Sequence, residues 1–342
     1  MIFDRLEQVH KGLLPVHPLP FQDELLSSWL VRLAHSNHFK VHTFCRLFVG
    51  EKRQIWNRDI DTYAPEWLID AMCRITGSKK EIVDQTTLKS FESLVFDRIY
   101  PHTVTPWILP LGIYHRNRTL YGLQYCPICL KLDKQPYFRK QWRLSFYTVC
   151  EFHHVLMLDR CLNCSSPIIF HRNDIGFNKE SFYSSMIMCH ICGHEISNIS
   201  VQNFQHPNQQ ISQAFLSFLP IYRLGWTDFP LPQIMYTPLF LKGVRVISSL
   251  LTSTKEKAQL SLLQIEADMG FKFETDLPSM SVTFERRDIY ERHRLLIATI
   301  WLLMDWPYRF HYYYKKFRLT KSIILQDMQN PPYFILGAMR DL

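Results

Sequence analysis

The stretch CEFHHVLMLDRCLNC, residues 150–164, decides how the middle of this chain folds. It holds five good ligands for soft metal ions: Cys150, His153, His154, Cys161 and Cys164. Two residues separate Cys150 from His153 and Cys161 from Cys164, a spacing that lets one tight turn aim both side chains at one ion. The stretch therefore supplies the second half of one metal site and the first half of the next.

Two further pairs in the chain have the same spacing, Cys126 with Cys129 and Cys189 with Cys192. Two such turns complete a tetrahedral zinc shell, so the pattern predicts two zinc ions. Pairing the turns in sequence order gives a three-cysteine, one-histidine site followed by a four-cysteine site. Their predicted ligands are Cys126, Cys129, Cys150 and His153 for the first site and Cys161, Cys164, Cys189 and Cys192 for the second.

Spacing leaves some assignments open. A cross-braced arrangement, first pair with third and second with fourth, uses the same eight residues. His154 could replace His153, and His190 or His194 could substitute at the far end. We favour His153 because it keeps the two-residue gap of the other three pairs. Since every ligand position is filled, no site is left for water or substrate, and the zinc ions are expected to be structural rather than catalytic.

Cysteine usage and hydropathy place the chain in a class. Nine cysteines without a signal peptide favour metal binding over a disulfide framework, and Cys45 and Cys73 fall in apolar, helical settings typical of core residues. The longest apolar run, LLIATIWLLM at 295–304, is about half a membrane span. We therefore expect a folded cytoplasmic protein with no membrane segment.

The net charge of +8 is concentrated in two segments. Residues 115–172 and 286–321 each hold nine Lys or Arg against three Asp or Glu, which gives +6 each and leaves −4 for the rest. Such clusters suggest a polyanion partner, although each residue could equally be a solvated charge or contact an acidic protein. The candidate contacts for a nucleic-acid backbone or a partner are Arg139, Lys140, Arg143, Arg286, Arg287, Lys315 and Lys316.

Helical patterns flank the cysteine-rich part. In PLPFQDELLSSWLVRLAHSN, residues 18–37, apolar side chains recur at helical spacing from Leu25 to Leu33, and a second short pattern runs from Val41 to Phe48. This pair reads as a helix-turn-helix or as a plain helical hairpin. The fold class predicted is mainly α and multidomain. Its expected parts are a helix-turn-helix-like domain at 1–114, a tandem zinc-finger region at 115–195, a linker at 196–236 and a helical domain at 237–342.

The order of these motifs resembles the TniQ/TnsD family of transposition target-selection proteins. The resemblance covers about residues 18–195 and rests on YCPICL at 125–130, YFRKQWRLSF at 137–146, CEFHHVLMLDRCLNC and CHICGHE at 189–195, with DWPYRF at 305–310 similar in style. Carried over by position, the two zinc motifs of the family fall on the eight paired residues. The resemblance also implies a homodimer built from helix-turn-helix and zinc-finger parts.

The resemblance implies a non-enzymatic adaptor that links an RNA-guided CRISPR effector complex at target DNA to an AAA+ transposition regulator. The alternative is a TnsD-like protein that recognises an attachment site in DNA directly and recruits the same regulator. The short C-terminal part after DWPYRF favours the adaptor. An enzyme is the third class, but no HExxH, P-loop or GxSxG motif is present. We expect a bacterial cytoplasmic protein that is nucleoid-associated when it acts.

Overall fold

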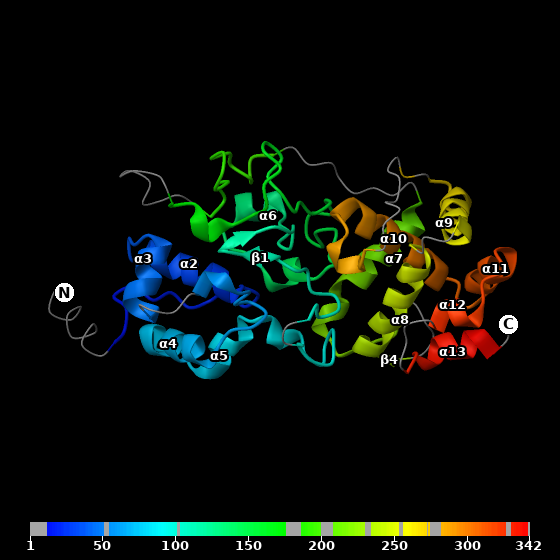
Figure 1. The fold of residues 1–342 in the computed structure, drawn as a ribbon, viewed down its shortest axis with the longest axis horizontal. Helices are drawn as coiled ribbons and strands as arrows, with labels where there is room; N and C mark the ends of the chain where they lie inside the picture. Colours follow the sequence, from blue (N-terminus) through cyan, green and yellow to red (C-terminus); the bar gives the residue numbers. More distant parts are fainter. Residues whose placement is uncertain are drawn as a thin grey trace. The chain divides into compact units, whose positions relative to one another are not determined.

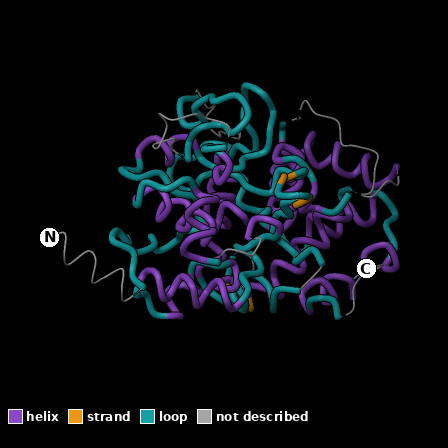
Figure 2. Tube along the Cα trace, turned by 60° about the vertical axis from the view of Figure 1, so that its left-hand side comes forward, coloured by secondary structure: helices purple, strands orange, loops and turns teal. Residues whose placement is uncertain are grey.

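The structure is a computed structural model, and it describes residues 12–50, 55–100, 103–175, 186–199, 208–229, 234–252, 256–271, 273, 282–325 and 330–340. Helices dominate it and the strands are short, which confirms the mainly α fold class (Figures 1 and 2). The chain divides into two compact units. Unit 1 comprises Met1–Glu92, Ile99–Leu144 and Met157–Val201, and unit 2 comprises Ser93–Arg98, Ser145–Leu156 and Gln202–Leu342.

Unit 1 contains short helices and one small hairpin. Its α-helices are α2 (Leu26–Ser36), α3 (Val41–Phe44), α4 (Glu66–Thr76), α5 (Lys80–Gln85) and α6 (Pro127–Leu132). A π-helical turn, η1 (Cys45–Val49), continues α3, and four 3-10 turns are η2 (Ile55–Asn57), η3 (Leu88–Phe91), η4 (Lys140–Arg143) and η5 (Phe170–Arg172). Its two strands, β1 (Ile113–Tyr114) and β2 (Asn117–Arg118), pair antiparallel.

Helix α2 forms because its apolar residues repeat at the helical period and cover one face. Leu26, Trp29, Leu30 and Leu33 are all fully buried, and the helix ends at Ser36. The neighbouring α3 packs against it, and η1, which continues α3, packs against α4. Only part of their apolar pattern is buried, because Leu47 is 56% exposed.

Helices α4 and α5 form a second pair joined by a tight turn. Helix α4 ends at Thr76 and is capped by Gly77, whose φ of 69° is the left-handed conformation that favours glycine at a helix C-terminus. Its main-chain N–H donates to the carbonyl oxygen of Cys73. The turn brings α5 against α4, so that Val83 is buried, whereas Ile82 on the same short helix is 39% exposed.

Unit 2 is a bundle of helices with a second small hairpin. Its α-helices are α7 (Gln209–Phe218), α8 (Thr237–Leu250), α9 (Glu256–Met269), α10 (Ile289–Leu303), α11 (Tyr308–Lys316), α12 (Lys321–Leu325) and α13 (Tyr333–Arg340). Two 3-10 turns are η6 (Leu219–Arg223) and η7 (Phe284–Arg286). Strands β3 (Trp226–Thr227) and β4 (Met235–Tyr236) pair antiparallel.

Helix α10 is the centre of unit 2. Almost all of its residues are buried, and α7, α8, α9 and α11 pack around it. Its buried charges find partners: the Arg294 guanidinium bonds both carboxylate oxygens of Glu266, and Arg292 donates to the carbonyl oxygen of Ser145 at 2.6 Å. The close approach of α8 and α13 requires Gly243, since a Cβ there would lie 2.2 Å from the ring of Phe334.

The predicted domain ranges and the compact units differ. The sequence separates residues 1–114 from 115–195 and treats 196–236 as a linker, whereas unit 1 contains parts of both of the first two ranges. The predicted linker contains helix α7, in which Ile211, Phe215 and Phe218 are buried. None of the helices in the described part of the chain combines the length and the apolar character needed to cross a membrane.

Candidate metal centres

The eight predicted ligands gather into two groups of four. Their ligand atoms lie within 4.8 Å of one another in each group. One group is Cys126, Cys129, Cys150 and His153, and the other is Cys161, Cys164, Cys189 and Cys192. The structure therefore pairs the turns in sequence order and not in the cross-braced order.

The distances within the groups suit a tetrahedral ion. In the four-cysteine group the Sγ atoms of Cys161 and Cys192 are 3.7 Å apart, and those of Cys164 and Cys189 are 3.6 Å apart. Zn–S bonds of about 2.3 Å in a tetrahedron place neighbouring sulfur atoms about 3.8 Å apart. In the other group, Sγ of Cys150 lies 3.5 Å from Nδ1 of His153. Each group can hold one metal ion with no ligand position left open.

Three of the four ligand turns share one backbone design. The first cysteine donates its N–H to the carbonyl oxygen five residues on, from Cys150 to Val155, from Cys161 to Ser166 and from Cys189 to His194. Its own carbonyl oxygen accepts from the N–H four residues on, in His154, Ser165 and Gly193. Each turn is flanked by an isolated antiparallel bridge, Val149 with Leu156, Arg160 with Pro167 and Met188 with Glu195.

The residue four positions after the first cysteine has a left-handed backbone in all three turns. The φ angles are 51° at His154, 58° at Ser165 and 68° at Gly193. This position reverses the chain, and the residue just before it supplies the second ligand in each turn. The design explains why His153, and not the adjacent His154, joins the group, and His194 likewise serves through its carbonyl oxygen.

The remaining turn is built differently. Cys126 caps the N-terminus of α6, and its Sγ accepts from the N–H of Cys129 at 3.5 Å. Pro127 occupies the first turn of the helix, where the missing N–H costs nothing. This pair therefore relies on a helix end for the geometry that the other pairs obtain from a hairpin-like turn.

The three basic residues that the sequence assigns to nucleic-acid contact in this region are not available for it. Arg139, Lys140 and Arg143 are 7%, 7% and 0% exposed. Arg139 pairs with Asp133 at 2.8 Å, and Arg143 pairs with Asp59 at 2.6 Å and with Asp61 at 3.5 Å. The predicted contact roles of these three residues are therefore wrong, because acceptors inside unit 1 already bind their charged groups.

Lys140 is also engaged inside unit 1. Its Nζ donates to the carbonyl oxygen of Gln85 at 2.5 Å and to Oγ of Ser90 at 3.0 Å. Burial lowers the pKa of its ammonium group to about 8, and Asp23 opposes the shift. Through these two hydrogen bonds Lys140 links η4 to the chain around η3.

The C-terminal candidates divide into buried and exposed residues. Arg287 is 6% exposed and pairs with Glu291 at 3.3 Å, so its predicted contact role is also corrected. Arg286 is exposed at the end of η7, and Lys315 and Lys316 are exposed at the end of α11. Lys316 donates to the hydroxyl of Tyr312 at 3.0 Å. These three residues stay candidates for contact with a polyanion.

Sequence analysis missed the small hairpin formed by β1 and β2. Tyr114, His115, Arg116 and Asn117 are exposed on it, whereas Arg118 is buried and donates to the carbonyl oxygen of Ile168 at 2.8 Å. The signal that could have found it is the run HRNR at 115–118. In the sequence these arginines contribute only to the net charge of residues 115–172.

The fold and the site define a class: a mainly helical protein with two Cys/His groups of four ligands each. Residues 15–157 match the model of the TniQ family, and no curated protein matches the chain. The match covers less than half of the chain and identifies a TniQ domain at these residues. This domain supports a role in transposition, in target selection or DNA binding.

Proposed function

We propose that the chain is a non-enzymatic adaptor for target selection in DNA transposition. It links an RNA-guided CRISPR effector complex at the target DNA to an AAA+ transposition regulator, in the bacterial cytoplasm. The TniQ domain at residues 15–157 supports the transposition part of this proposal. The choice of an adaptor over a direct reader of DNA depends on which surfaces the two units leave exposed.

The two Cys/His groups support a structural role for the centre of the chain. Thiolate-rich, four-coordinate sites at these distances are typical of zinc, so we assign zinc to both groups. Cys126, Cys129, Cys150 and Cys161 are buried, which leaves little room for a substrate. Bound zinc would hold the turns in place, and the protein would act by binding rather than by catalysis.

The observation that supports an adaptor function is an apolar face on the hairpin of unit 2. Trp226 and Tyr236 are cross-strand partners in the β3–β4 register and are 53% and 45% exposed. Leu224 and Ile234 lie two residues away on the same face and are 53% and 72% exposed. The opposite face, with Thr227 and Met235, is buried. Four large apolar side chains on one exposed face are typical of a surface that binds another protein.

The buried basic residues of unit 1 also favour an adaptor over a direct reader of DNA. With Arg139, Lys140 and Arg143 engaged inside unit 1, the central segment presents fewer cations to DNA than its sequence suggests. A protein that reads an attachment site by itself needs many contacts to phosphates and bases. An adaptor needs only weak, sequence-blind DNA binding while proteins provide the specificity.

The test is to purify the tagged full chain from its own host at moderate salt and to identify what accompanies it. We expect effector subunits with guide RNA together with the regulator. A double variant, Trp226→Ser with Tyr236→Ser, should lose at least one protein partner while keeping its metal content. The matched control is Tyr308→Ser on α11, since Tyr308 is 72% exposed outside the apolar face.

Each result decides between the two functions. Recovery of only the regulator, with DNA enriched in one chromosomal site, would show that the chain reads DNA directly, as a TnsD-like protein does. Recovery of effector subunits that the Tyr308→Ser control keeps and the double variant loses would assign the docking role to the β3–β4 hairpin.

A further inference from the structure

The hairpin of unit 1 has an unusual turn. Strands β1 and β2 are joined by the two residues His115 and Arg116, because Tyr114 and Asn117 are partners in the register. Both turn residues are left-handed, with φ of 45° and 66°. A two-residue turn of this kind favours Asn-Gly, and a residue with a Cβ costs roughly 1 kcal/mol or more in this conformation. The chain nevertheless places a histidine and an arginine there, both exposed.

A second arginine supports the turn from another part of the chain. Arg172, at the end of η5, donates to Oδ1 of Asn117 at 2.5 Å and lies 3.5 Å from the carbonyl oxygen of Arg116. These contacts fix the turn and hold a second guanidinium group beside it. Arg172 is only partly buried.

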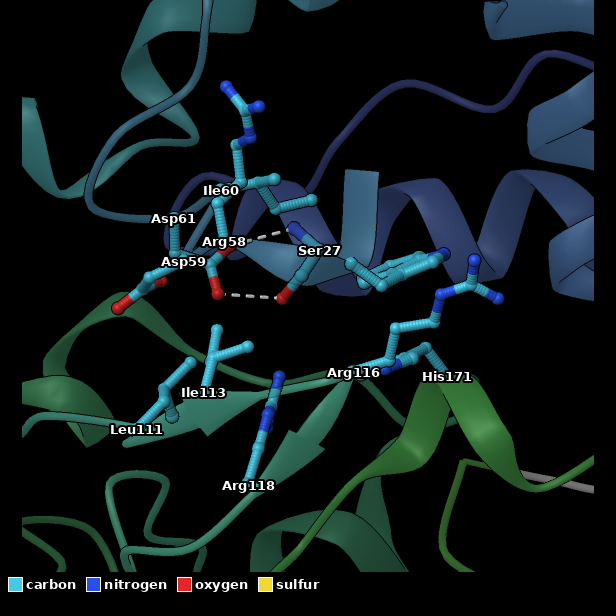
Figure 3. A pocket seen from close by; sticks show the side chains of 11 residues that line it. Ser27, Arg58, Asp59, Ile60, Asp61, Leu111, Ile113, Arg116, Arg118 and His171 are labelled. Atoms are coloured by element: carbon cyan, nitrogen blue, oxygen red, sulfur yellow. Dashed lines mark hydrogen bonds between the residues drawn. The ribbon is translucent and has the colours of Figure 1, made fainter. Parts of the chain in front are cut away.

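The charge at this turn is not cancelled by acidic side chains. Arg116 forms no ion pair with any described acidic group. It lines a cavity of about 10 Å³ with Arg58, Arg118 and His171 (Figure 3). Asp59 and Asp61 line the same cavity, but both are paired with Arg143. The net charge of the turn and its surroundings is therefore positive, which contrasts with the neutralised Arg139 and Arg143.

The positive potential reaches into the unit. Burial lowers the pKa of His42, Asp174 opposes this, and Arg116 and Arg172 add to the lowering. Arg116 and Arg172, which come from separate segments of the sequence, thus act on the same half-buried side chain. They form one basic surface rather than two unrelated exposed charges.

We propose that the tip of the β1–β2 hairpin, with Arg116 at its turn and Arg172 behind it, is the surface of unit 1 that contacts the phosphate backbone of duplex DNA. The inference rests on the proposed function, which places the chain at target DNA, and it adds the residues that make the contact. Arginine guanidinium groups suit phosphate oxygens, which they bond through two parallel N–H donors. The contact is sequence-blind, as expected for backbone contacts.

The test uses the strain of the turn. A double variant, His115→Asn with Arg116→Gly, carries the residues that this turn prefers, so the full chain should keep or raise its thermal midpoint. Its affinity for a random-sequence DNA duplex should fall roughly tenfold, the loss of one charge-assisted hydrogen-bonded contact. The slope of log affinity against log salt should become shallower by about 0.9. A loss of binding with a retained midpoint cannot be attributed to unfolding.

Three single variants sharpen the result. His115→Asn alone keeps Arg116 and should keep DNA affinity. Lys134→Gln, an exposed cation elsewhere in unit 1, should also leave it unchanged. Arg46→Gln removes an exposed cation from η1, the second helix of the helix-turn-helix-like pair. If Arg46→Gln lowers affinity and the double variant does not, the helix pair carries the contact and the inference is wrong.

The outcome is distinguishable from failure of the proposed function. Unchanged affinity and salt slope in the double variant would overturn the hairpin assignment, whatever proteins the chain recruits. Loss of DNA binding in the double variant would support the hairpin even if no effector complex were recovered from the host. A wild-type chain that binds no duplex at all would also overturn the inference, because the surface would then lack its ligand.

Discussion

The main-chain N–H of His154 donates to the carbonyl oxygen of Cys150 at 2.8 Å, and this bond separates the ligand histidine from its neighbour. It closes the turn with His154 in the left-handed conformation, φ 51°, and leaves His153 to join the ligand group. The same bond recurs from Ser165 to Cys161 and from Gly193 to Cys189. Backbone conformation, rather than side-chain chemistry, thus selects which of two adjacent histidines can bind metal.

The two adjacent histidines should respond oppositely to substitution. His154→Gly removes a strained side chain without touching a ligand, so it should retain both metal ions and raise the free energy of unfolding by about 1 kcal/mol. His153→Ala should bind one metal ion fewer per chain. Metal analysis of the purified variants and their urea unfolding curves provide the check. A His154→Gly protein that lost metal would contradict the assigned turn.

Removing a ligand from the four-cysteine group should destabilise unit 1. Cys164→Ser keeps the shape of the side chain but weakens a ligand of an ion whose binding contributes on the order of 10 kcal/mol to a small metallodomain. We expect loss of one metal ion and a large fall in the thermal midpoint, and a chelator should produce the same change in the wild type. Cys73→Ser, outside both groups, is the control. Retained metal content and midpoint in Cys164→Ser would refute the site.

Local patterns in the sequence were sufficient for several elements. The apolar spacing from Leu25 to Leu33 predicted α2, and its burial confirms that prediction. The two-residue gaps predicted which cysteines share a turn. The helical spacing of Ile211, Phe215 and Phe218 is also present in the sequence, but Pro207 and Pro220 on either side of it are typical of a linker.

Ion pairs between distant segments could not be predicted in this way. Arg143 and its partner Asp59 are 84 residues apart in the chain, and no periodicity relates them. A basic run therefore looks the same in the sequence whether its charges face solvent or are paired inside. The hairpin at 113–118 was missed for a related reason: its strands are too short to show alternation, and its turn lacks the glycine that usually reveals one.

The buried pairing of Arg143 leads to a stability prediction. Arg143→Met should leave Asp59 and Asp61 without their partner and cost about 3–5 kcal/mol in the free energy of unfolding. Adding Asp59→Asn and Asp61→Asn to the same chain should recover part of that loss, because the uncompensated carboxylates are removed. Urea denaturation of the three proteins measures both effects. If Arg143→Met were neutral, the ion pairs would not be part of the stable fold.

Lys140 predicts a pH dependence of stability whose sign follows from burial. Its pKa falls from an ordinary value of 10.5 to about 8 in the folded chain, so the unfolded chain binds more protons between these two pH values. Stability should therefore rise as pH increases from about 8 toward 10.5, where the buried amine is neutral when folded. Lys140→Met should remove this rise, whereas Lys134→Met, at an exposed position, should retain it. Unfolding free energies measured across this range for the three proteins test the prediction, and identical pH profiles for wild type and Lys140→Met would contradict it.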